Sequence, residues 1–109
     1  MKIILLLLWT GLYPSSENPA DQIIGQYWIN DKSGKIAIYK KKDRYFGKII
    51  WRKEVRKDSK NPDPNLRKRS VIGLEFLQDF EYHPAKKQWI KGKVYSIENG
   101  GTYRGKIWL

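Results

Sequence analysis

Two arginines offer the clearest anion-binding chemistry in the chain. Arg67 and Arg69 are two positions apart, so their side chains point the same way if that segment is extended. A guanidinium presents a fork of donors that matches a carboxylate or a phosphate, and the pair could therefore clamp an anion. The structural alternative, which we favour, is that one arginine ties its own loop to Asp58, Asp63 or backbone carbonyl groups.

Residues for a catalytic or metal site are few and scattered. His83 is the only histidine, and it precedes Pro84 in an expected turn, which suits a Ser-His-Asp arrangement poorly. The chain has no cysteine, which excludes a thiol nucleophile and a thiolate metal site. The remaining candidates are carboxylates whose spacing does not bring them together: Asp58, Asp63, Glu75 and Glu98. We therefore expect no enzymatic activity, no metal and no cofactor.

Aromatic residues are abundant enough to build a ligand-binding interior. The chain has five Trp, seven Tyr and three Phe. A small β-barrel lined by such rings could hold a small apolar or amphipathic ligand, although the side chains of a narrow barrel can also fill it. The lining would include some of four aromatic residues: Trp28, Trp51, Tyr95 and Trp108.

The net charge of +11 suggests a second kind of binding. Cations interleaved with aromatic residues on an outer surface could attract an anionic envelope polymer or a membrane surface, with rings stacked on Trp or Tyr. A surface that is merely solvated is the alternative. Across both binding hypotheses, the candidate ligand-binding residues are Trp28, Trp51, Arg67, Arg69, Trp89, Tyr95 and Tyr103.

Alternating apolar and polar residues predict antiparallel β-strands as the elements that position these side chains. Turn-forming clusters separate the strands, among them residues 30–34 and the Asn99-Gly100-Gly101 hairpin turn. No stretch has helical spacing, so we expect an all-β meander. The predicted strands cover residues 25–30, 35–41, 44–52, 70–82, 88–97 and 101–109.

The alternation also assigns faces. Ile36 and Ile38 share one face of their strand. One face of the next strand should carry Tyr45, Gly47, Ile49 and Trp51. The inward set of 70–82 should be Ile72, Leu74, Phe76, Phe80 and Tyr82. Glycines inside strands favour bulges or bends, which predicts a strongly curved sheet that forms a barrel or half-barrel. These glycines are Gly47, Gly73, Gly92 and Gly105.

A proline-rich connector precedes the fourth predicted strand. Pro62 and Pro64 fix φ and keep the residues before them, Asn61 and Asp63, out of the helical region. Asn61 and Asp63 can also accept hydrogen bonds from backbone groups two residues on. The connector should therefore be a rigid bracket that points Leu66 toward the sheet.

The connector is part of a longer pattern that resembles a known family. The run D-x-x-N-P-D-P-x-L-R-x-R-x-x-x-G-L spans residues 58–74, and W-x-x-G-x-x-Y and G-x-T-Y follow at 89–95 and 100–103. Over residues 24–109 the chain resembles the bacterial exported family catalogued as domain of unknown function two-one-four-seven. The resemblance implies a fold similar to that of the calycins, the lipocalin-like antiparallel barrels, and it implies no activity. The structural motif residues are Asn61, Pro62, Asp63, Pro64, Leu66, Gly73 and Gly92.

Two departures from the family pattern bear on function. Members commonly have Tyr-Asp-Pro after the second glycine motif, where this chain has Tyr95-Ser96-Ile97. Members also continue into a further hairpin, so we expect an incomplete barrel with an exposed last strand here. An exposed strand edge can pair with another chain, and a homodimer or a strand-adding partner is therefore a third binding hypothesis.

The first residues have the form of a secretory signal. Lys2 is followed by an apolar core over residues 3–13 and then by a polar segment. We expect a signal peptide over residues 1–20, with an approximate end, and one secreted or periplasmic domain over 21–109. The apolar core is too short to span a bilayer, and no other such segment follows. Export argues against nucleic acid as a partner.

Overall fold

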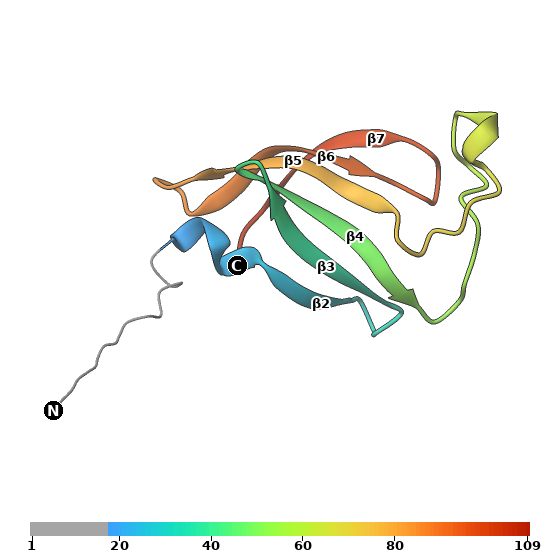
Figure 1. The fold of residues 1–109 in the computed structure, drawn as a ribbon, viewed down its shortest axis with the longest axis horizontal. Coiled ribbons are helices and arrows are strands. Elements are labelled where there is room, and N and C mark those ends of the chain that lie inside the picture. Colours follow the sequence, from blue (N-terminus) through green and yellow to red (C-terminus); the bar gives the residue numbers. More distant parts are fainter. Residues whose placement is uncertain (1–17) are drawn as a thin grey trace, which may run out of the picture.

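Residues 18–109, described in a computed structural model, form one twisted antiparallel sheet (Figure 1). Each of its six strands pairs with the next one along the chain, from β2 to β7. The strands are β2 Gly25–Ile29, β3 Gly34–Lys41, β4 Arg44–Arg52, β5 Glu75–His83, β6 Gln88–Tyr95 and β7 Thr102–Ile107. The predicted signal peptide lies outside the described residues, apart from residues 18–20.

The sheet curves without closing on itself. In the described residues, β2 and β7 share no hydrogen-bonded ladder. Figure 1 shows the chain running from β7 back to the start of β2, so that the C-terminal residues approach the opposite edge of the sheet. The predicted all-β meander with an incomplete half-barrel is confirmed. Pairing of the last strand with another chain stays a prediction.

A short 3-10 helix, η2 (Pro19–Ile23), covers one end of the half-barrel (Figure 1). The Asn18 side chain caps this helix by accepting a hydrogen bond of 3.0 Å from the Ala20 backbone nitrogen. The Trp89 indole nitrogen donates to the Ala20 carbonyl at 3.0 Å, which fixes the helix against the sheet. The main core gathers beneath it and consists of Ala20, Ile23, Ile38, Tyr45, Leu77, Phe80 and Trp89.

A β-bulge in β4 corrects one of the predicted faces. Lys35 pairs with Trp51, whereas Ile36 pairs with Ile49, so Ile50 is an extra residue in this strand. One extra residue turns every later side chain to the other face of the sheet. The prediction that Trp51 shares the face of Ile49 is therefore wrong, and Trp51 lies on the outer face.

The start of β5 and its inward residues also differ from the prediction. The strand begins at Glu75, because Gly73 has a φ of 89° and turns the chain before it. Asp79 has a φ of 60° and forms a bulge in this strand. Before the bulge the buried side chain stands at an odd-numbered position, and after it at an even-numbered one. The buried residues of this strand are Leu77 and Phe80, whereas Ile72 is 38% exposed. Alternation within one strand cannot reveal such an insertion.

Gly92 shows why a glycine is needed inside a strand of this sheet. A Cβ atom at this position would overlap the ring of Phe80, which is 1% exposed and lies across the neighbouring strand. The absence of a side chain thus makes room for the largest ring of the β5 core. Gly73, by contrast, lies in the turn before β5 and not inside a strand.

The long connector between β4 and β5 lies at the end of the sheet opposite η2 (Figure 1). It contains a second 3-10 helix, η3 (Pro64–Leu66), and the extended conformation of Asp63 agrees with the predicted bracket. Leu66 is only half-buried, and other side chains of the connector pack on the sheet instead. The resulting second core cluster consists of Ile49, Val71, Leu74 and Ile97.

Candidate functional site

The inner face of the half-barrel contains an apolar hollow of about 380 Å³. Alternation brings Tyr27 and Ile29 of β2 beside Ile36 and Ile38 of β3, and Ile107 of β7 closes the other side. The volume falls in the range of about 300–1,000 Å³ that small-molecule pockets occupy. The full lining is Ile23, Tyr27, Ile29, Ile36, Ile38, Phe76, Leu77, Ile107, Trp108 and Leu109.

The chemistry of this lining is almost wholly apolar. No lining residue carries a charged side chain. The one hydroxyl, on Tyr27, donates to the Ile23 carbonyl at 2.7 Å and is therefore already engaged. Such a surface favours an apolar molecule through the hydrophobic effect and offers no ion pair to a charged one.

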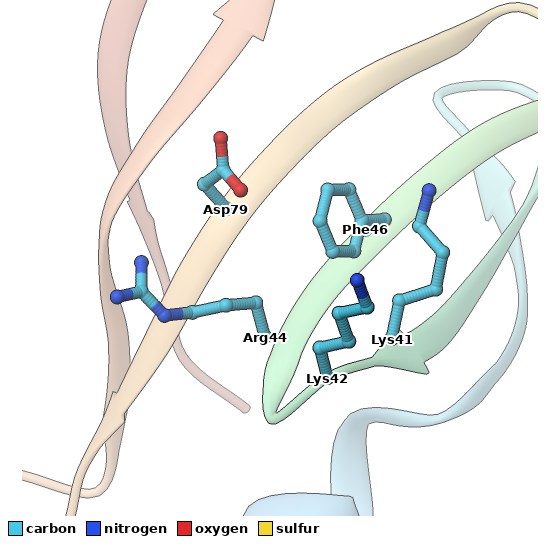
Figure 2. A pocket seen from close by; sticks show the side chains of 5 residues that line it. All are labelled: Lys41, Lys42, Arg44, Phe46 and Asp79. Atoms are coloured by element: carbon cyan, nitrogen blue, oxygen red, sulfur yellow. The ribbon is translucent and has the colours of Figure 1, made fainter.

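A second depression lies on the outer surface between β4 and β5 and measures about 850 Å³. Its cations are partly neutralised, because Lys41 pairs with Glu75 and Arg44 pairs with Glu81, each at 3.1 Å. In Figure 2 the guanidinium of Arg44 turns away from the two lysines. The depression could hold a small anion only weakly, since water screens its exposed charges. The lining residues are Lys41, Lys42, Arg44, Phe46 and Asp79.

The two arginines of the predicted anion clamp are engaged within their own connector. The segment is not extended, because η3 ends at Leu66 and Arg67 is helical. Arg67 donates through Nε to the Asn61 carbonyl at 2.7 Å. Arg69 binds the Asp58 carboxylate through Nη2 at 3.0 Å and through Nε at 3.1 Å. These contacts are those of the structural alternative, in which the arginines tie down the loop.

Asp58 is the centre of this tie. Its carboxylate is fully buried and accepts hydrogen bonds from Tyr95 Oη at 2.6 Å and from Asn61 Nδ2 at 2.8 Å, besides the contacts with Arg69. Burial alone would raise the pKa of Asp58, but the hydrogen bonds from Tyr95, Asn61 and Arg69 outweigh it and hold the pKa below its usual value. The carboxylate is therefore a satisfied structural anion.

The predicted aromatic residues lie in three different environments. Trp89 is buried under η2, and Tyr95 is bound to Asp58. Trp28 and Trp51 lie on the outer face, where they are 52% and 45% exposed, so these two rings do not line the interior. Tyr103 is 52% exposed and accepts a hydrogen bond from the Asn99 amide at 2.8 Å.

None of the seven predicted ligand-binding residues lines the apolar hollow. Of the four residues considered for the interior, only Trp108 does. The hollow depends instead on aliphatic residues, and the shared face of Ile36 and Ile38 was the signal in the sequence that could have found it. We predicted aromatic residues because their rings are large enough to line a cavity. The sequence does not indicate where smaller side chains leave space unfilled.

Neither a metal centre nor a membrane-crossing helix is found among residues 18–109. In this part of the chain no three His, Cys, Asp or Glu residues come close enough to hold a metal ion. Its helices are too short and too polar to cross a bilayer.

Comparisons with known proteins agree with this geometry. A family of uncharacterized proteins conserved in bacteria, DUF2147, matches residues 25–109. A solved structure from the human pathogen Helicobacter pylori, of a protein described as belonging to the lipocalin family, is 26% identical to the chain with a TM-score of 0.68. The match covers 80% of this chain and 64% of that one. No curated protein matches the sequence. The chain belongs to the DUF2147 family, and its half-barrel has a lipocalin-like fold.

Proposed function

We propose that the protein is a non-enzymatic binding protein whose inner hollow takes up a small apolar ligand. The observation that carries the proposal is the hollow itself, about 380 Å³ of space with an apolar lining on the inner face of the sheet. Proteins with a lipocalin-like β-fold typically bind a small ligand on the inner face of the barrel, and the hollow lies on the corresponding face here.

The lining also indicates the ligand class. A ligand with a charged group would lose hydration without gaining an ion pair, since no lining side chain is charged and the hydroxyl of Tyr27 is already engaged. Each buried methylene of an apolar ligand would gain about 0.8 kcal/mol. Micromolar affinity for a ligand of modest size would be ordinary for such a site.

The test uses N-phenyl-1-naphthylamine, a neutral dye whose fluorescence rises in apolar surroundings. A neutral dye is needed because an anionic one would also collect on a protein with a net charge of +11. We expect saturable binding that does not change with salt. Ile36→Trp, which fills the hollow, should weaken binding at least tenfold while changing the free energy of unfolding by about 1–3 kcal/mol.

Two further variants make this test specific. Val55→Trp adds the same indole at a side chain that is 74% exposed and outside the lining, and it should leave binding unchanged. Ile36→Ala enlarges the hollow and should keep binding. A loss of binding in Ile36→Trp alone would therefore come from the filled hollow and not from a disturbed fold. If Ile36→Trp binds the dye as tightly as the parent protein, or if Val55→Trp loses binding equally, the hollow is not the site.

The proposal includes export to the periplasm or the exterior. If a signal peptide is removed, removal before Asn18 fits the fold best, because Asn18 caps η2 and Ala20 packs against Trp89. Mass spectrometry of the exported protein should therefore find a mature N-terminus at residue 18 or earlier. A mature chain that begins at Asp21, with unchanged thermal stability, would contradict this assignment.

A further inference from the structure

The outer face of β2, β3 and β4 carries two exposed tryptophans in one row. Trp28 pairs with Lys35, and Lys35 pairs with Trp51, so all three side chains point outward together. The two indole rings meet edge to face, with centroids 6.0 Å apart. Trp28 is 52% exposed and Trp51 is 45% exposed, which is unusual for a pair of the largest apolar side chains.

Lysines surround this pair and lack acidic partners. Lys32 and Lys35 place their ammonium groups 5.7 and 4.7 Å from the centre of the Trp28 ring. Lys48 lies one row further along the same face, 5.4 Å from the Tyr39 ring. In the described part of the chain, no carboxylate forms an ion pair with these three lysines. Trp28, Lys32, Lys35, Lys48 and Trp51 are called the Trp–Lys face.

We propose that the Trp–Lys face docks on the surface of an anionic phospholipid bilayer. Indole rings are amphipathic and prefer the depth of the lipid headgroups. Lysines keep an aliphatic stem near apolar groups while the ammonium group contacts phosphate. Each lysine near an anionic surface adds about 1 kcal/mol of attraction, so the lysines of this face and the overall charge of +11 favour the encounter.

The arrangement favours a bilayer over a soluble anionic polymer. A polymer that is held by stacking needs a free aromatic ring face. Two ammonium groups of the protein already lie over the Trp28 ring, and that ring meets Trp51 in a T-shaped contact. A bilayer needs no free ring face, because the rings enter the headgroup layer and the lysines stay at its phosphates.

The test is flotation of the protein with vesicles of phosphatidylcholine alone or with about one third phosphatidylglycerol, a fraction chosen to resemble an anionic membrane. We expect binding to the anionic vesicles only, weakened by added salt. Lys35→Glu with Lys48→Glu should lower the partition coefficient roughly tenfold or more. Lys35→Gln with Lys48→Gln should lower it less, and it removes the concern that reversed charges disturb the sheet.

The matched control reverses two cations on another part of the outer surface. Lys93 of β6 and Lys106 of β7 are also exposed, so Lys93→Glu with Lys106→Glu gives the same net charge without touching the Trp–Lys face. This control should lower partition much less. An equal loss in both double variants would mean that net charge alone drives binding, and the proposal of a specific face would be wrong.

The tryptophans give a second readout. Bilayers that contain brominated lipid should quench the protein's fluorescence, and Trp28→Phe with Trp51→Phe should remove most of that quenching, whereas Trp108→Phe should not. Binding of soluble alginate that depends on Lys35 and Lys48, without binding to vesicles, would replace the bilayer with a polymer and overturn the proposal. Absence of binding to anionic vesicles at low salt would do the same.

Discussion

The two apolar regions at the inner face of the sheet are built from the same residue types and differ in how they are covered. The second core cluster, Ile49, Val71, Leu74 and Ile97, is sealed by the β4–β5 connector. The apolar hollow, half of whose lining residues are isoleucines, lies where β2 and β7, the two edge strands of the sheet, do not pair with each other. Residue type alone therefore does not decide which apolar surface becomes core and which stays open to a ligand.

The sealed region owes its cover to polar contacts. Asp58 joins the connector to β6 through Tyr95, and Gly100 of the last hairpin packs directly against the Lys60 carbonyl. The hollow has no comparable polar tie in its lining. The difference indicates that the long sequence motif around Asp58 serves the architecture, whereas the proposed binding site lies at the aliphatic positions of β2, β3 and β7.

Removal of the Asp58 carboxylate should have the largest effect on the sealed region. Asp58→Ala leaves Tyr95, Asn61 and Arg69 without their shared acceptor, and we expect a loss of about 2–4 kcal/mol in the free energy of unfolding, because Arg69 is partly exposed and can regain water. Urea denaturation of the parent protein and the variant measures this loss of unfolding free energy. Asp63→Ala, which removes only the cap of η3, should cost about 1 kcal/mol.

The same variant sharpens the comparison between the two regions. Under conditions where Asp58→Ala is still folded, its affinity for N-phenyl-1-naphthylamine should stay within about twofold of the parent value, a difference below 0.5 kcal/mol. A large loss of affinity with the fold intact would show that the two regions are coupled and would break the distinction drawn between them.

A pair of glycine variants should give the next largest effect. Gly100 and Gly73 have φ values of 76° and 89°, so alanine is strained at both positions. A Cβ atom at Gly100 would also overlap the Lys60 carbonyl, whereas at Gly73 it would meet nothing within 4 Å. We expect Gly73→Ala to cost about 1 kcal/mol.

Gly100→Ala should cost at least about 1 kcal/mol more than Gly73→Ala, because the connector must move away from the hairpin. Thermal melts of the two variants measure the difference. Equal losses would mean that the contact between the last hairpin and the connector contributes nothing to the seal.

Acid should destabilise the fold through two carboxylates, Asp58 in the sealed region and Asp21 on η2. Tyr45 donates to Asp21 and, with Lys40, holds the pKa of Asp21 below its usual value, as the contacts described above do for Asp58. Both groups therefore add stability above the unfolded pKa of about 3.9, and that stability is lost as the pH falls through their lower folded pKa values. Midpoints of urea unfolding should fall steeply below about pH 4.

Asp58→Asn provides the control for this acid effect. The variant lacks the titrating carboxylate, so its unfolding midpoint should fall less steeply over the same pH range. Parallel curves for the parent and the variant would assign the acid effect to other carboxylates. Binding of the neutral dye by the folded protein should not change over this pH range, because the lining of the hollow contains no Asp, Glu or His side chain.

The sequence predicts the strand order and the tie around Asp58 well, because both depend on local chemistry. Prolines, turn residues and alternation mark the strand ends, and the contact of Arg69 with Asp58 is one of the alternatives that residue types alone suggest. The wrongly assigned faces have one physical cause. Bulges at Ile50 and Asp79 depend on the neighbouring strand, so the alternation of a single strand assigns Trp51 and Leu77 to the wrong rows.

The hollow is the central claim, and a crystal structure with bound 1-bromonaphthalene tests it most directly. The naphthyl group is apolar and of suitable size, and its bromine can be located by anomalous scattering. We predict a bromine peak inside the hollow, within contact distance of Ile36 and Phe76. A hollow filled by the protein's own side chains, or a bromine bound only at Trp28 and Trp51 on the outer face, would contradict the proposed function.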